Sequence, residues 1–93
     1  MAFYAVIWKY VKNPDLIASV RTPHVDYLKG LFAKKQLHEA GAWLDGSGAL
    51  LVFEVEDRVA LAPLLANDPF TPAGVITETT IFDWNPVFGA FKK

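Results

Sequence analysis

The chain contains no cysteine, and this absence excludes several kinds of chemistry at once. A disulfide framework, a zinc–thiolate site and a thiol nucleophile all require that residue. Because there are also only two histidines, a multi-histidine metal site within one chain is not expected. The fold therefore has to rely on packing, and any reaction has to use other side chains.

Charge of one sign and long apolar runs are also missing. Ten acidic residues against nine basic ones give a net charge of −1, and the only adjacent basic pairs are Lys34–Lys35 and Lys92–Lys93. A nucleic-acid partner would need a clustered basic face, so none is expected. The apolar run from Ala49 to Phe53 is far too short to cross a bilayer, and residues 1–4 do not begin a secretory signal. We therefore expect a cytoplasmic protein without a membrane partner.

Apolar and aromatic side chains are abundant instead. They make up 53% and 14% of the 93 residues. A domain of this size buries only about 60–65% of the surface that its unfolded chain exposes. One small layer cannot easily cover so much apolar surface. Residues 1–93 are therefore expected to form a single domain that assembles as a homodimer, and further assembly of dimers stays open.

Hydrophobic periodicity predicts the order strand, helix, strand, strand, helix, strand. A tight turn, Asp45–Gly48, joins the second and third strands. This order is the split βαβ arrangement of ferredoxin-like domains, in the α+β class, with both helices on one sheet face. Both alternating sets of the first strand are apolar, so the sheet of a second copy is the simplest cover for the opposite face. The expected strands span 3–10, 37–44, 49–55 and 75–84, and the expected helices span 22–35 and 58–66.

The start of the first helix carries the first candidate catalytic residue. A polar break at residues 12–15 ends the first strand, and Thr22 as N-cap with Pro23 at the first helical position then begins the helix. His24 would lie at the second position, where the helix dipole favours the neutral imidazole that a general base needs. Because His24 is outside the apolar set, His24→Ala is expected to cost no more than about 0.5 kcal/mol. A surface histidine without a role is the alternative.

Asp68 is the expected partner of His24. It precedes a proline, so its backbone is biased to an extended conformation and its side chain is expected to be displayed rather than buried. In a split βαβ fold, the start of the first helix and the loop before the last strand lie at the same end of the sheet. A carboxylate there can orient the imidazole and stabilise its protonated form. An aspartate that only shapes the turn is the alternative.

Two further residues are candidates for contacting a substrate. Arg21 lies three residues before His24, and its guanidinium suits a carboxylate or an enolate oxygen, with simple solvent exposure as the alternative. The ring of Phe70 either covers a pocket or belongs to the core. His38 is expected to be structural or solvated. The strand aromatics that could line a pocket, but more often serve as core or interface, are Tyr4, Trp8 and Trp43.

Several short motifs, distributed over nearly the whole chain, resemble the YciI-like (YCII-related) family. They are Arg21-x-x-His24-x-x-Tyr27-Leu28, Ala40-Gly41, Asp45-x-x-Gly48-Ala49-Leu50-Leu51-Val52 and Asp68-Pro69-Phe70. The resemblance implies a dimeric α+β barrel with a ferredoxin-like protomer, and a pocket in which His24 and Asp68 are the proposed catalytic pair. One branch of the family resembles a dehydrochlorinase of hydroxylated chloroaromatics, and the fold resembles muconolactone isomerase. Family members often carry proline after Ala-Gly, where this chain has Ala42.

Together these features predict a small enzyme of the lyase, isomerase or hydrolase type that acts on a small, cyclic or aromatic substrate. His24 would transfer a proton, Asp68 would orient it, and Arg21 and Phe70 would contact the substrate. No cofactor is required, because one positioned acid/base group contributes about 10²–10⁴-fold in rate. Two alternatives stay open. One is a non-catalytic binding or accessory module that uses the same pocket; the other is a haem-binding protein with His24 or His38 as axial ligand.

Overall fold

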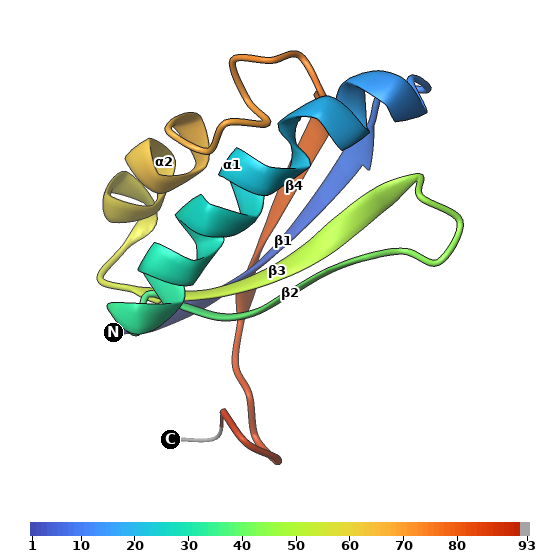
Figure 1. Ribbon diagram of the computed structural model, residues 1–93. Coiled ribbons are helices and arrows are strands. Elements are labelled where there is room, and N and C mark those ends of the chain that lie inside the picture. The colour runs from blue at the N-terminus through green and yellow to red at the C-terminus, as the bar shows by residue number, and fades with distance from the viewer. Residues whose placement is uncertain (92–93) are drawn as a thin grey trace.

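The computed structural model describes residues 1–91, and the basic pair Lys92–Lys93 lies outside the described residues. The strands form one antiparallel sheet in the order β2-β3-β1-β4, and both helices lie on the same side of it (Figure 1). This is the α+β, ferredoxin-like arrangement that the sequence predicts. The elements are β1 (Ala2–Tyr10), α1 (Pro14–Ala33), β2 (Leu37–Ala42), β3 (Gly48–Val55), α2 (Arg58–Ala66) and β4 (Ile76–Trp84).

The first helix begins nine residues earlier than the sequence analysis placed it, and Asn13 rather than Thr22 is its N-cap. The side-chain oxygen of Asn13 accepts a hydrogen bond from the backbone N–H of Leu16 at 3.1 Å, and a proline follows at the first helical position. The supposed polar break is thus a capping motif. Pro23 lies inside α1, where it lacks the N–H that a helix interior normally uses. His24 is therefore in the middle of α1, and the helix-dipole argument for a neutral imidazole does not apply.

The β2–β3 hairpin differs from the expected one at both strands: β2 ends at Ala42, two residues earlier than expected, and β3 begins at Gly48, one residue earlier. The N–H of Trp43 donates to the carbonyl of Gly48 at 2.9 Å, and the N–H of Gly46 donates to the carbonyl of Trp43 at 2.9 Å. Gly46 adopts a φ of +75°, which favours glycine. A Cβ at Gly48 would overlap the carbonyl oxygen of Trp8, so this strand position also requires glycine.

The hydrophobic core fills the space between the helices and the sheet. One alternating set of β1 faces the helices, and its Val6 and Trp8 are almost fully buried. The second helix has the predicted bounds and the predicted cap, because Asp57 accepts a hydrogen bond from the N–H of Ala60 at 2.8 Å. Leu61 of this helix is completely buried. Within residues 1–91, no helix is long and apolar enough to cross a membrane.

Within residues 1–91, no helix lies on the opposite face of the sheet. Phe3 and Ala5 of β1 share this face with their register partners Trp84 and Phe82 of β4. Phe82 and Trp84 remain 52% and 41% exposed. The helices therefore cover only one of the two apolar faces of β1, as the sequence predicts.

Candidate active site

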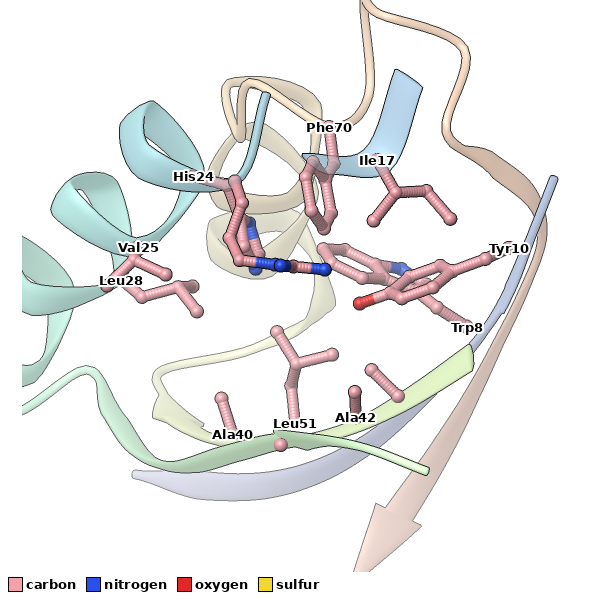
Figure 2. A pocket seen from close by; sticks show the side chains of 13 residues that line it. Trp8, Tyr10, Ile17, His24, Val25, Leu28, Ala40, Ala42, Leu51 and Phe70 are labelled. Carbon is pink, nitrogen blue, oxygen red and sulfur yellow. The ribbon is translucent and has the colours of Figure 1, made fainter. Parts of the chain in front are cut away.

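A cavity of about 200 Å³ lies between α1 and the sheet. Trp8, Tyr10, His24 and Phe70 all project into this space, from β1, from the middle of α1 and from the loop after α2 (Figure 2). The small side chains of residues 40–42 on β2 form the opposite wall. An engineered apolar cavity of roughly 150 Å³ holds a benzene molecule, so this cavity has room for a single substituted ring.

His24 and Asp68 meet at this cavity, forty-four residues apart in the chain. Nδ1 of His24 lies 2.8 Å from Oδ1 and 3.0 Å from Oδ2 of Asp68. The two side chains are buried rather than displayed, because His24 is 8% and Asp68 only 1% exposed. The expected approach of the two residues is confirmed, whereas their expected exposure is wrong. Helix α1 lies over one side of the sheet (Figure 1), and the His24 side chain points from it into the cavity (Figure 2).

The loop after α2 holds the Asp68 carboxylate in position. Its Oδ1 accepts a second hydrogen bond, from the backbone N–H of Phe70 at 2.9 Å, which closes a turn of the kind that aspartate favours. The carbonyl of Asp68 also accepts the N–H of Thr71 at 2.9 Å. Asp68 therefore has both of the contacts that the sequence analysis considered: its side chain shapes the turn and also contacts His24.

The contact with Asp68 leaves one nitrogen of His24 available. Because Nδ1 faces the carboxylate, Nδ1–H donates to it and Nε2 is the nitrogen left for a ligand. No hydrogen bond to Nε2 occurs within residues 1–91, and Nε2 is not sealed off, because no buried side-chain nitrogen or oxygen there lacks a partner. Phe70 stacks on the imidazole at 3.7 Å between ring centroids, with 7° between the planes. The stacking and the hydrogen bond together fix the direction of Nε2.

The two predicted substrate contacts both reach the cavity. Arg21 lies about one helical turn before His24 on α1 and lines the cavity while remaining largely exposed. It is in the middle of the helix rather than at its start. Phe70 is 2% exposed and belongs to the core cluster, and it also forms part of the cavity wall.

Tyr10 is the cavity residue that the sequence analysis missed. Its pKa is raised from 10.0 to about 12, firstly by burial and secondly by the negative charge of Asp68, while the positive charge of Arg21 acts in the opposite direction. The available signal was alternation along β1, which places Tyr10 on the same face as Trp8. Tyr10 was not singled out because aromatic residues on strands were assigned to the core or to an interface by default.

His38 lies apart from the cavity, on the helix-free face of the sheet. Its Nε2 is 2.6 Å from Oε1 of Glu54, and its ring stacks on Phe3 at 5.4 Å. This is the structural role expected for it. Within the described chain, no group of three or more His, Cys, Asp or Glu side chains could hold a metal ion.

Comparison with known proteins connects this geometry to a family. The model of the YCII-related domain matches residues 2–85, which is most of the chain. The chain belongs to the YCII-related family. In this YCII-related protein, the residue after Ala40-Gly41 is Ala42, at the position for which the resemblance implies proline in many relatives. Ala42 forms part of the cavity wall.

Two solved structures resemble the YCII-related chain over most of its length. The first is 5-chloro-2-hydroxyhydroquinone dehydrochlorinase from Burkholderia phenoliruptrix AC1100, in complex with 2,5-dihydroxybenzoquinone. It is 24% identical, with a TM-score of 0.80, and the match covers 89% of this chain and 93% of the other. The second is Rv0793 from Mycobacterium tuberculosis, which is 16% identical, with a TM-score of 0.57 and coverage of 96% and 99%. No curated protein matches the sequence. Identities at this level establish a shared fold.

Proposed function

We propose that this YCII-related protein is a small acid–base enzyme in which His24 exchanges a proton with a planar, hydroxylated ring compound. The observation that carries the proposal is the buried pair at the cavity: Nδ1 of His24 is held at 2.8 Å by Asp68, while Nε2 stays available to a ligand. A positioned imidazole whose second nitrogen is oriented by a carboxylate is a common general base.

The proposed step is a proton transfer between substrate and imidazole. Nε2 accepts the proton of a ring hydroxyl or of an acidic ring C–H, and the electron pair of the broken bond stays on the substrate. The Nδ1–H···Asp68 hydrogen bond stabilises the imidazolium that forms. Arg21, whose side chain lines the same cavity, offsets the negative charge that develops on the substrate. In an isomerisation, His24 then returns the proton at another ring position. With a chlorinated ring, the electron pair left on the substrate instead expels chloride as the C–Cl bond breaks, and His24 passes its proton to solvent.

The size and the walls of the cavity support a single ring as substrate. The volume is about 200 Å³, and Trp8 and Phe70 offer flat aromatic surfaces on which a ring can stack. The dehydrochlorinase with the same fold was solved with 2,5-dihydroxybenzoquinone, which is also a small planar ring with oxygen substituents. Hydroxylated and chlorinated benzene rings are therefore the first compounds to assay.

Ring-proton exchange tests the proposed function without requiring the natural substrate. In deuterated buffer, the protein should accelerate exchange of ring hydrogens of 5-chloro-2-hydroxyhydroquinone or release chloride from it, measured by NMR and by a chloride electrode. His24→Gln should lower the rate by about 10²-fold or more, the range of one acid–base group. His38→Gln is the matched control and should keep the rate, because His38 lies on the other face of the sheet.

The same assay separates the enzyme from a binding module. Tight binding of 2,5-dihydroxybenzoquinone together with neither ring exchange nor chloride release on any ring compound tested would favour the non-catalytic alternative. Equal rates for His24→Gln and the unmodified protein would refute the assigned role of His24.

We also propose that the protein is a homodimer in which the helix-free sheet faces pack together. Four large apolar side chains on this face and on the following segment are exposed, namely Phe82, Trp84, Val87 and Phe88, at 52%, 41%, 68% and 94%. Single exposed apolar residues are ordinary, but Phe82 and Trp84 lie two residues apart on the same face of β4, and exposed apolar groups of this kind are typical of an interface. The family resemblance implies a dimeric α+β barrel, which would cover this face with the sheet of a second copy.

A further inference from the structure

The Tyr10 hydroxyl is a polar group of the cavity that the proposed proton transfer does not use. Tyr10 is the last residue of β1, and backbone hydrogen bonds fix its position. Its N–H donates to the carbonyl of Ser47 at 2.8 Å, and the N–H of Val11 donates to the carbonyl of Val75 at 2.7 Å. The pairing with β4 shifts register between Lys9 and Tyr10. Irregularities of this kind often occur beside functional sites, where they direct a side chain.

The aromatic ring of Tyr10 is held next to the catalytic pair. It meets the Phe70 ring edge to face, with 5.5 Å between centroids and 84° between planes. Phe70 also stacks on the imidazole of His24, with 3.7 Å between centroids. Phe70 thus touches both rings and sets their relative orientation. In Figure 2 the Tyr10 oxygen points into the space that His24, Trp8 and Ala42 surround.

The Tyr10 hydroxyl has no partner of its own within residues 1–91. It makes no hydrogen bond there, although it is not sealed from the cavity, because no buried side-chain oxygen in that range lacks a partner. Tyr27 on α1 provides the contrast, since its hydroxyl donates to the carbonyl of Leu64 at 2.7 Å. A partly buried phenol normally finds a partner, so an unpaired hydroxyl facing a cavity indicates a site for a ligand atom.

The protonation state of Tyr10 makes it a donor over the whole neutral range. Burial and the charge of Asp68 raise the pKa of Tyr10 to about 12, so the hydroxyl keeps its proton throughout the neutral range. A neutral phenol that donates to a negatively charged oxygen forms one of the stronger hydrogen bonds in proteins. The nearby charge of Arg21, which lowers the pKa of Tyr10, would attract the same anion.

We propose that Tyr10 donates a hydrogen bond to a ring oxygen of the substrate and thereby selects rings that carry a phenolate or enolate oxygen. This inference rests on the proposed function and names the group that the cavity recognises. When a proton leaves the ring, negative charge spreads to its oxygens, and a preorganised donor there stabilises that charge. His24 and Tyr10 then contact different atoms of one ring, and Arg21 adds a positive charge beside the Tyr10 subsite.

Two compounds that differ by one hydroxyl test the assignment. 4-Nitrophenol and nitrobenzene have nearly the same size, and ionisation of the first is followed by its yellow absorbance. The unmodified protein should bind 4-nitrophenolate more tightly than nitrobenzene. Tyr10→Phe should weaken 4-nitrophenolate binding roughly tenfold or more, because hydrogen bonds to charged groups have this magnitude, and should change nitrobenzene affinity less than about twofold. Tyr4→Phe is the matched control, the same change on the same face of β1 outside the cavity lining.

Three outcomes overturn the inference. They are unchanged 4-nitrophenolate affinity in Tyr10→Phe, an equal loss for both compounds, which would indicate a role in shape alone, and no binding of either compound by the unmodified protein. A thermal melt by circular dichroism verifies that each variant is folded. Because binding of 4-nitrophenolate requires no turnover, this experiment can fail while His24 still catalyses ring exchange, and it can succeed where ring exchange is absent.

Discussion

Replacing His24 by alanine should destabilise the fold, because the residue is buried against a buried carboxylate. The substitution removes the hydrogen bond from Nδ1 to Asp68, and it also removes the ring on which Phe70 stacks at 3.7 Å. Asp68 is 1% exposed and would keep only the N–H of Phe70 as a partner for its side chain among the hydrogen bonds described here. The sequence analysis predicts a negligible loss of folding stability for His24→Ala, whereas the structure predicts a large one.

The size of the effect follows from the environment of Asp68. Removing one partner of a buried ion pair or of a charged hydrogen bond typically costs about 3–5 kcal/mol. Here the remaining Phe70 N–H and the neighbouring cavity, which admits water, place the cost at the lower end, about 3 kcal/mol. For a domain of 60–100 residues, each kcal/mol lowers the melting temperature by roughly 4–8 °C, so the melting temperature should fall by about 12–24 °C.

Urea unfolding followed by circular dichroism measures this cost directly. Asp26→Ala, on the exposed side of the same helix, is the control and should change stability by no more than about 0.5 kcal/mol. The double variant His24→Ala with Asp68→Asn should be more stable than the two single effects predict, because it removes the unpaired charge. A loss for His24→Ala no larger than that of the control would refute the argument that Asp68 depends on His24.

Three further outcomes are expected. Burial raises the pKa of Tyr10 from 10.0 to about 12, so its contribution to stability is fully present below pH 10 and is lost as the pH rises toward 12; urea unfolding should show a smaller loss over this range in Tyr10→Phe. Arg21→Gln should weaken 4-nitrophenolate binding about threefold to tenfold, measured by absorbance titration, while a fixed affinity would remove Arg21 from the site. Phe82→Lys should yield monomers in light scattering, whereas Val59→Lys should not, because Val59 is apolar and even more exposed, at 81% against 52%, but lies on the helix side.

The elements were predictable because their signals are local. Alternation identified both faces of β1, and the Asp57 cap identified the start of α2. The start of α1 was not predictable, because the chain carries two helix-start signals of the same type. Asn13 before Pro14 and Thr22 before Pro23 each satisfy the N-cap rule, and a proline in a helix interior is uncommon. The structure uses the first signal and continues through the second, a choice made by packing against the sheet rather than by local preference.

The site was predictable in its members but not in its burial. The approach of His24 and Asp68 was predicted, but from a wrong position of His24, because the residue lies in the middle of α1 and not at the start of the helix. Their burial depends on how α1 crosses the sheet and on how the loop before β4 folds inward, neither of which has a sequence period. Tyr10 was overlooked for a related reason, since an aromatic residue at a strand end reads as core until a cavity is known to lie beside it.

The burial of the pair means that one hydrogen bond has both a structural and a chemical consequence. The Nδ1–Asp68 contact fixes α1 to the loop after α2, and it also determines that Nε2 faces the cavity. Loss of activity in His24→Ala alone would therefore not identify a base, because the variant also loses stability. Asp68→Asn separates the two consequences, since an amide oxygen can still accept from Nδ1–H and from the Phe70 N–H but carries no charge to stabilise an imidazolium. Retained stability with reduced proton exchange in that variant would assign the carboxylate charge to chemistry, whereas a parallel loss of both would assign it to the fold.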